Sequence, residues 1–175
     1  MTPPPGLIIR RGRAADAAML ADLAARTFCD AFGAQNTAED LAQHLASHYS
    51  LDLQAAELAD PDMTTLIAEV ADAPAGFAQV AARPAPPDLP AGGGLFLSRF
   101  YLEQTWIGRG VAQVLMAAVL ESARERGASY LWLTVWEENP RAVAFYEKWG
   151  FVKAGRTTFI VGEDPQVDWL MTCTL

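Results

Sequence analysis

Two glycines lie between a predicted apolar strand and a predicted helix, and this order of strand, glycine turn and helix restricts the folds that the chain can adopt. Leu95 to Leu102 is rich in Leu, Phe and Tyr and predicts a strand. The turn IGRGVA, Ile107 to Ala112, follows, and apolar residues then recur at helical spacing to about Arg126, where Gly127 ends the pattern. Ser129 to Trp136 predicts another strand. This order predicts an α/β chain with a mixed sheet flanked by helices.

The remaining segments fit the same class. A length of 175 residues favours one domain spanning residues 1–175. Thr37 with Asp40 resembles a capping box at a helix start, and Asn139-Pro140 opens another helix that Gly150 closes. Further strands are predicted at Leu7–Arg10, Thr64–Val70, Gly76–Ala82, Phe151–Val161 and Gln166–Leu175. A turn is predicted around Ala73-Pro74 and a loop at Pro84–Gly94. Helices are predicted around Leu20–Phe28, Leu41–Tyr49 and Leu51–Leu58.

Charge and cysteine usage exclude several classes of protein. A net charge of −8 argues against a binder of nucleic acid, which needs clustered Lys and Arg. Cys29 and Cys173 are too few for a disulfide framework and lie in no zinc-site spacing. The apolar run Val111 to Leu120 is too short to cross a bilayer, and no signal core is visible. We therefore expect a cytoplasmic protein without a nucleic-acid or membrane partner.

The glycine turn suggests an anion site. Gly108 and Gly110 let the backbone approach a ligand, and the free N–H groups of a helix start carry partial positive charge. The segment lacks the Lys-Ser/Thr pair of a P-loop and the third glycine of a dinucleotide fingerprint. It therefore indicates an anion other than a nucleoside triphosphate, although a tight turn alone would also need glycine.

A second motif, NPRAVAFYEKWGF, runs from Asn139 to Phe151. Each member has a purely structural explanation, because Asn139 can cap a helix, Phe145 and Trp149 can form a buried i, i+4 pair, and Gly150 can end the helix. Taken with the glycine turn, however, the motif resembles the GNAT superfamily of N-acetyltransferases. The matching residues are Gly110, Ala112, Asn139, Ala142, Phe145, Tyr146, Gly150 and Phe151, while Ile107 departs from the usual Gln or Arg.

The resemblance extends over nearly the whole chain and is most similar in pattern to bacterial Pai-type polyamine (spermidine/spermine) acetyltransferases. The segments that carry it are Thr27-Phe28 with Phe32, Asn36, LSRFYL, WLTVWEEN and TFIVGEDPQVDWLMTCTL. It implies a central mixed, mostly antiparallel sheet of about seven strands in which the strands ending at Leu102 and near Trp136 splay apart. It also implies direct transfer of an acetyl group from acetyl-CoA to a primary amine, with no metal.

The resemblance also assigns roles to residues. Backbone groups of Phe100 and Leu102 would hold the thioester and pantetheine, Asn139 the pantetheine arm, and Tyr146 would protonate the leaving thiolate. The pyrophosphate would take the amides of Ile107, Gly108, Arg109, Gly110, Val111 and Ala112, and Lys148 or Arg109 could reach an outer phosphate. The acceptor would border Phe28, Asp30, Phe32 and Tyr49.

The acceptor amine must also lose a proton. With a lysine-like pKa of ~10.4, neutralising it at pH 7 costs roughly 4.6 kcal/mol, so a base or a desolvating pocket must help. Glu69, Glu103, Glu137 and Glu138 are possible bases, as is a water relay, and Glu137 is favoured among them.

The sequence is also compatible with other functions. The acceptor could be a protein or peptide amine, or the protein could be an acyl-CoA sensor without turnover, and a monomer and a homodimer are equally compatible with the sequence. His44 and His48 have the i, i+4 spacing of metal ligands, but the sequence HLASH lacks the Glu of HExxH and no third ligand is evident. A metal-dependent hydrolase is therefore the weaker alternative.

Overall fold

The computed structural model describes residues 2–34, 36–161 and 164–175, and these residues form one seven-stranded sheet in the order β1-β2-β3-β4-β5-β7-β6. Neighbouring strands are antiparallel except β4 and β5, which are parallel and joined through a helix. The expected mixed, mostly antiparallel sheet is confirmed. The strands are β1 Leu7–Arg11, β2 Met63–Val70, β3 Ala73–Ala81, β4 Gly94–Leu102, β5 Tyr130–Trp136, β6 Val152–Val161 and β7 Asp164–Thr174.

The helices begin where capping residues stand in the sequence. The Thr37 hydroxyl accepts from the Asp40 amide at 3.1 Å, and Asn139 Oδ1 accepts from the Ala142 amide at 3.1 Å with Pro140 in the first turn. Each bond satisfies an amide that the helix itself leaves free. The helices are α1 Ala17–Phe32, α2 Ala38–His48, α3 Leu51–Ala59, α4 Val111–Glu125 and α5 Pro140–Lys148. None of these helices has the length and apolar character needed to cross a membrane.

The turn between β2 and β3 lies two residues earlier than predicted. Ala71 and Asp72 form it, with φ of 50° and 63°. A type I′ hairpin turn requires positive φ at both central positions, which Pro74 cannot adopt. Pro74 instead lies in β3 opposite Glu69, at an irregularity in the pairing where a missing N–H is tolerated.

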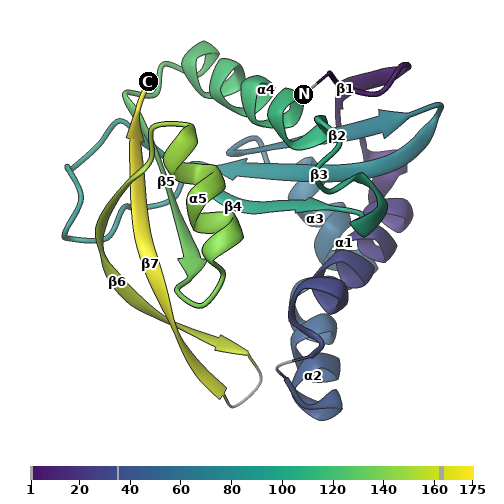
Figure 1. The fold of residues 1–175 in the computed structure, drawn as a ribbon, viewed down its shortest axis with the longest axis horizontal. Helices are drawn as coiled ribbons and strands as arrows, with labels where there is room; N and C mark the ends of the chain where they lie inside the picture. The colour runs from purple at the N-terminus through teal and green to yellow at the C-terminus, as the bar shows by residue number, and fades with distance from the viewer. Residues whose placement is uncertain (1, 35, 162–163) are drawn as a thin grey trace.

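Helices cover both faces of the sheet (Figure 1). On one face α4 and α5 bury the larger core, in which Leu115, Met116 and Val119 of α4 are fully buried against the sheet. On the other face α1 and α2 enclose a second core around Phe28 and Phe77.

The parallel pairing of β4 and β5 is short. It covers Gly94 to Phe96 against Tyr130 to Trp132, and the Phe96 and Trp132 rings stack at 4.0 Å where it ends. Just beyond, the register of β4 against β3 shifts at Ser98, which is the mark of a β-bulge. Because a bulge bends its strand, β4 diverges from β5 at this point, and the two strands part as expected.

His44 lies at the centre of the second core. It is 3% exposed, and its ring stacks between Phe28 at 4.3 Å and His48 at 4.1 Å. Its Nδ1 has no hydrogen-bond partner among the described residues. Burial, followed by the charges of His48 and Arg99, lowers the pKa of His44 from 6.5 to about 4. The two histidines therefore behave as stacked aromatic residues, and His44 is neutral at pH 7.

We predict that His44→Phe makes the protein more resistant to mild acid. Below pH 6.5 the unfolded chain binds a proton at His44 that the folded protein binds only near pH 4, so native stability is lost as the pH falls through this window. The free energy of unfolding should therefore fall by about 2 kcal/mol less between pH 7.5 and pH 4.5 in His44→Phe than in the native protein. Urea unfolding of both proteins at the two pH values measures this. Parallel losses in both proteins would contradict the prediction.

Candidate functional site

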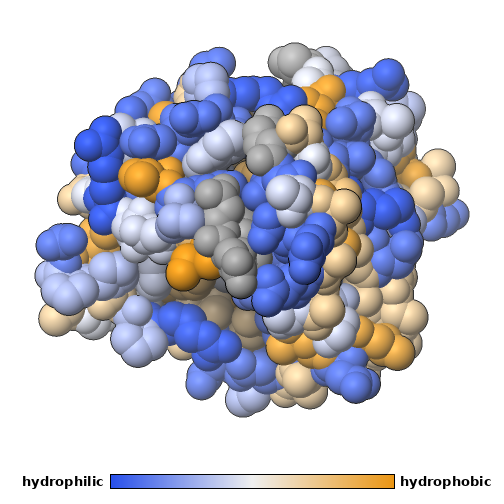
Figure 2. All heavy atoms as spheres, turned by 90° about the horizontal axis from the view of Figure 1, so that it is seen from below, coloured by the Kyte–Doolittle hydropathy of each residue, from blue (hydrophilic) through white to orange (hydrophobic). Residues whose placement is uncertain are grey.

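A cleft of about 890 Å³ opens where β4 and β5 part. Its walls come from β4, β5, the start of α4, one face of α5, the end of α1 and the β6–β7 pair. Seen from the end that carries α2, the surface is hollowed between hydrophilic and hydrophobic side chains (Figure 2). The volume lies in the upper part of the range of ~300–1,000 Å³ for ligand pockets.

The glycine turn reaches the cleft through part of its length. Ile107, Gly108 and Ala112 line the cleft, and a side chain at Gly108, with φ of 77°, would meet nothing within 4 Å. Gly110 has φ of 87° as N-cap of α4, but it is buried, with the Pro3 backbone 3.0 Å from the position of an added Cβ. The open part of the turn is therefore at Gly108, while Gly110 supports the N-terminal segment.

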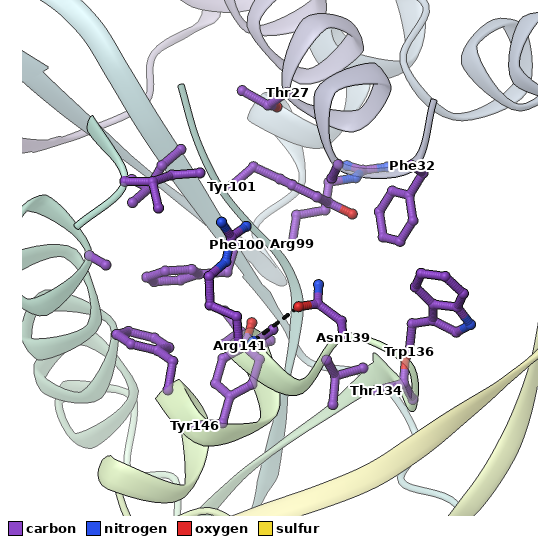
Figure 3. Close-up of a pocket in the computed structure, with 18 of the residues that line it drawn as sticks. Thr27, Phe32, Arg99, Phe100, Tyr101, Thr134, Trp136, Asn139, Arg141 and Tyr146 are labelled. Carbon is purple, nitrogen blue, oxygen red and sulfur yellow. Dashed lines mark hydrogen bonds between the residues drawn. The ribbon is translucent and has the colours of Figure 1, made fainter. Parts of the chain in front are cut away.

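Asn139, the N-cap of α5, and Tyr146 within α5 both line the cleft. Asn139 uses its Oδ1 to cap the helix and directs its amide nitrogen into the space that the labelled side chains surround (Figure 3). Tyr146 is 8% exposed and packs against the rings of Phe100, Phe145 and Phe151. Burial raises the pKa of the Tyr146 phenol well above its usual value, so the phenol stays protonated and can donate a proton.

Cationic side chains line the α5 side. Lys148 lies at the cleft as predicted, and Arg141, which the sequence did not single out, extends from α5 toward β4 (Figure 3). Arg109 is absent from the lining, and its guanidinium lies 5.8 Å from the Trp106 ring centre. Val111 is fully buried. The candidates for an outer phosphate are therefore Lys148 and Arg141.

The opposite end of the cleft is aromatic and acidic. Phe32 at the end of α1 lies 6.2 Å from Trp136 at the end of β5, and Phe159 of β6 lies on the same wall. Asp30 is exposed at the rim. Aromatic faces and carboxylates both attract organic cations.

A buried carboxylate lies in the wall between these groups. Asp168 on β7 is 5% exposed, lines the cleft and pairs in register with Trp136. It has a side-chain hydrogen bond with Thr134, while its Oδ1 has no partner in the described part of the chain. Burial raises the pKa of Asp168 to about 6, and the Thr134 bond acts in the opposite direction.

Three residues predicted for the acceptor side lie elsewhere. Phe28 and Tyr49, which are 1% and 6% exposed, belong to the core between α1 and α2 and do not line the cleft. Glu137 also lies outside the cleft lining, and its carboxylate pairs with Arg156 at 3.3 Å. Asp30 and Phe32 are the residues predicted for the acceptor side that line the cleft.

Sequence reasoning missed Asp168, although a signal was present. Along β7 the residues alternate, and Gln166, Asp168 and Leu170 are all buried. A carboxylate in the buried register of a strand is unusual and marks either a paired charge or a functional site. Among residues 2–34, 36–161 and 164–175, no three His, Cys, Asp or Glu side chains are grouped as metal ligands would be.

Comparison with known proteins identifies a common family. The model of the acetyltransferase (GNAT) family matches residues 25–151. An uncharacterised N-acetyltransferase of Lactobacillus delbrueckii subsp. lactis is 32% identical over 145 residues, covering 83% of this chain and 84% of the relative. An uncharacterised N-acetyltransferase of Mycobacterium tuberculosis is 35% identical over 156 residues, covering 89% and 96%.

The fold is also similar to that of solved structures. The PaiA N-acetyltransferase of Thermoplasma acidophilum, solved in complex with coenzyme A, superimposes with a TM-score of 0.79 over 97% of this chain and 99% of that one. Sequence identity in this pair is 17%, so the likeness concerns the fold.

Proposed function

The chain belongs to the GNAT family of acetyltransferases, and from this premise we propose that its acceptor is a small cationic amine such as a polyamine. The family makes it an acetyl-CoA-dependent N-acetyltransferase, in which acetyl-CoA supplies an activated acetyl group as a thioester. The acceptor and the roles of individual residues are the parts that we infer from the cleft.

The residues of the cleft fit acetyl-CoA. Beyond Phe96, the edge of β4 that faces β5 has no strand partner among the described residues, and in our proposal backbone groups of Phe100 and Leu102 bind the pantetheine like an added strand. The open space at Gly108, next to the first turn of α4, suits the pyrophosphate. In the proposed site, the Asn139 amide binds the pantetheine arm, and Arg141 and Lys148 attract the outer phosphate.

The proposal for the acceptor rests on the distribution of charged side chains along the cleft. Cations line the α5 side, where an anionic co-substrate would bind, whereas Asp30 and Asp168 lie at the other end with Phe32 and Trp136. Arg99, which also lines the cleft, is bonded to the Glu57 carboxylate, which balances its charge. A cationic amine with an aliphatic chain complements carboxylates set among aromatic rings.

In this proposal, Tyr146 is the acid of the reaction. An amine that attacks a thioester expels a thiolate, which needs a proton. The protonated, buried phenol of Tyr146 supplies it, and contacts with the rings of Phe100 and Phe151 hold the Tyr146 ring in place. Backbone N–H groups along the free edge of β4 stabilise charge that develops on the carbonyl oxygen.

An acceptor panel tests the proposed function. We expect acetyl-CoA with spermidine or spermine to release free thiol faster than with aminoglycosides, amino acids or peptides with free N-termini. Mass spectrometry of the product would confirm acetylation. Preferred turnover of a peptide amine would replace the proposed acceptor class, and cofactor binding without release from any acceptor would favour a sensor.

Tyr146→Phe should lower turnover without comparable loss of cofactor affinity. The substitution removes the hydroxyl that donates the proton and keeps the ring that packs against Phe100 and Phe151. Loss of a general acid typically reduces the rate by ~10²–10⁴-fold. Steady-state kcat and calorimetric Kd for acetyl-CoA separate the two effects. A kcat equal to that of the native enzyme would remove Tyr146 from the acid role.

Gly108→Asp and Gly127→Asp form a matched pair for the pyrophosphate site. Both glycines have positive φ, at 77° and 72°, and open space where a Cβ would stand, but Gly127 lies beyond the far end of α4. Both substitutions should therefore cost similar stability, about 1 kcal/mol. Only the carboxylate at position 108 would repel phosphate, so we expect acetyl-CoA Kd to rise at least about tenfold there and to stay near native at 127. Equal Kd values would place the pyrophosphate elsewhere.

A further inference from the structure

We propose that Asp168 is the carboxylate that receives the ammonium group of the acceptor and takes its proton before acetyl transfer. This inference rests on the proposed function only in requiring that the acceptor is an amine. It gives the reaction the base that the sequence alone did not identify, and it replaces Glu137, which pairs with Arg156 outside the cleft lining.

The sheet places Asp168 on the correct wall of the cleft. Asp168 pairs with Trp136 across β5 and β7, and directly paired residues of antiparallel strands project from the same face. Trp136 contacts Phe32 at the end of α1, so this face of β7 is the one that α1 covers. The carboxylate therefore belongs to the acceptor end of the cleft and lies on the face opposite the core under α5.

The hydrogen bonding of Asp168 is incomplete in a way that an ammonium group would complete. Thr134 bonds to the carboxylate, whereas Oδ1 is buried without a partner among the described residues. A buried carboxylate oxygen without a donor is costly, and such groups in native proteins call for an explanation. An amine bound in the cleft carries up to three donors and a compensating positive charge.

No neighbouring cation in the described chain neutralises this carboxylate. The charged side chains that line the same cleft are Asp30 on α1, Arg99 on β4, and Arg141 and Lys148 on α5, and β6 carries Lys153 and Arg156. Neither Arg141 nor Lys148 contributes to the pKa of Asp168, which is shifted by burial and by the Thr134 bond. Lys153 and Arg156 lie over the Trp169 ring, which projects from the opposite face of β7. Arg99 is bonded to Glu57, and Asp30 is a like charge. The hydroxyl of Thr134 on β5 is hydrogen-bonded to the carboxylate and carries no charge. A cationic acceptor is thus the counter-ion that the site lacks.

The pKa of Asp168 suits a base near neutral pH. Burial raises this pKa to about 6, so the group is mostly ionised at pH 7.5 and yet binds a proton more firmly than an exposed aspartate. No charged neighbour contributes to this shift. Burial raises the pKa, and the hydrogen bond with Thr134 lowers it by a smaller amount.

The proton balance follows from these placements. The ammonium gives one proton to the Asp168 carboxylate and becomes a neutral amine. The amine nitrogen then forms a bond to the acetyl carbon, the carbon–sulfur bond breaks, and the sulfur leaves with the bonding electron pair and takes the Tyr146 proton. The nitrogen loses a second proton, which restores the phenol through solvent, and Asp168 releases its proton to solvent. One amide, one thiol and one proton result.

Asp168→Asn tests the proposal with little change in shape. We expect kcat/KM for spermidine at pH 7.5 to fall by about 100-fold or more, while the calorimetric Kd for acetyl-CoA stays near native. The matched control is Asp88→Asn, an exposed aspartate in the loop before β4, which should keep kcat/KM within about twofold. Because burial penalises the charged form of Asp168, the Asn variant should keep a thermal midpoint at least as high as the native one at pH 7.5.

The pH profile separates a base from a structural residue. Native kcat/KM should fall as the pH drops through about 6, and Asp168→Asn should lack this limb. Thr134→Val removes a bond that lowers the pKa of Asp168, so its acid limb should move to higher pH. If the Asp168–Thr134 pair served structure alone, neither variant would displace the limb, and that result would overturn the proposal.

The outcomes distinguish failure of this inference from failure of the proposed function. If spermidine is not acetylated but a peptide amine is, the proposed acceptor class fails, and the same variants are measured with the peptide, because its amine also arrives as ammonium. Native rates from Asp168→Asn with every acceptor overturn the role of Asp168 alone. If no acceptor turns over, the Asp168 carboxyl ¹³C resonance, assigned with the Asn variant, is followed during a spermidine titration in the presence of coenzyme A. A resonance that does not move overturns the inference.

Discussion

The early parting of β4 and β5 is the constraint on which the site depends. Two parallel strands normally continue their hydrogen bonds along their length, but here pairing covers only Gly94 to Phe96. The stacked rings of Phe96 and Trp132 close the end of the paired part, and the bulge at Ser98 bends β4 away while its other edge stays paired to β3. Backbone groups on the free edge must find partners, and a ligand that binds like a strand is one solution.

Buried titratable groups show how burial sets the chemistry of the two cores. Tyr146, His44 and Asp168 are all less than one-tenth exposed, and in each the pKa moves toward the neutral form because burial disfavours charge. For His44 the neutral ring stacks among aromatic residues, so it contributes to packing. Tyr146 and Asp168 differ because they line the cleft, where a neutral donor and a weakly basic carboxylate can act on a bound molecule. Whether a buried titratable group contributes to packing or can act on a ligand thus depends on whether it lines the cleft.

Local sequence signals predicted most of the fold and several of the residues that line one side of the cleft. Helical and strand periodicity, the Thr37 and Asn139 caps and the glycine turn each depend on residues a few positions apart, so the elements and the start of α4 could be read directly. The acceptor side depends on contacts between distant segments. Aromatic residues of α1 have the same composition signature whether they face the core, as Phe28 does, or the cleft, as Phe32 does. The proximity of Asp168 to the cleft follows from the pairing of β7 with β5, which local sequence patterns do not reveal.

Adjacent turns of α1 contribute to the core and to the cleft wall. Phe28 and Phe32 are four residues apart on α1, and their rings lie 4.7 Å apart, so the buried ring fixes the direction of the cleft-facing one. Asp30, between them in sequence, points to the exposed rim. Substitutions at Phe32 or Asp30 can alter the acceptor end without touching the β4 edge or the glycine turn that face the co-substrate. If the proposed site is correct, this separation would allow the acceptor to change by substitution while acetyl-CoA binding is retained.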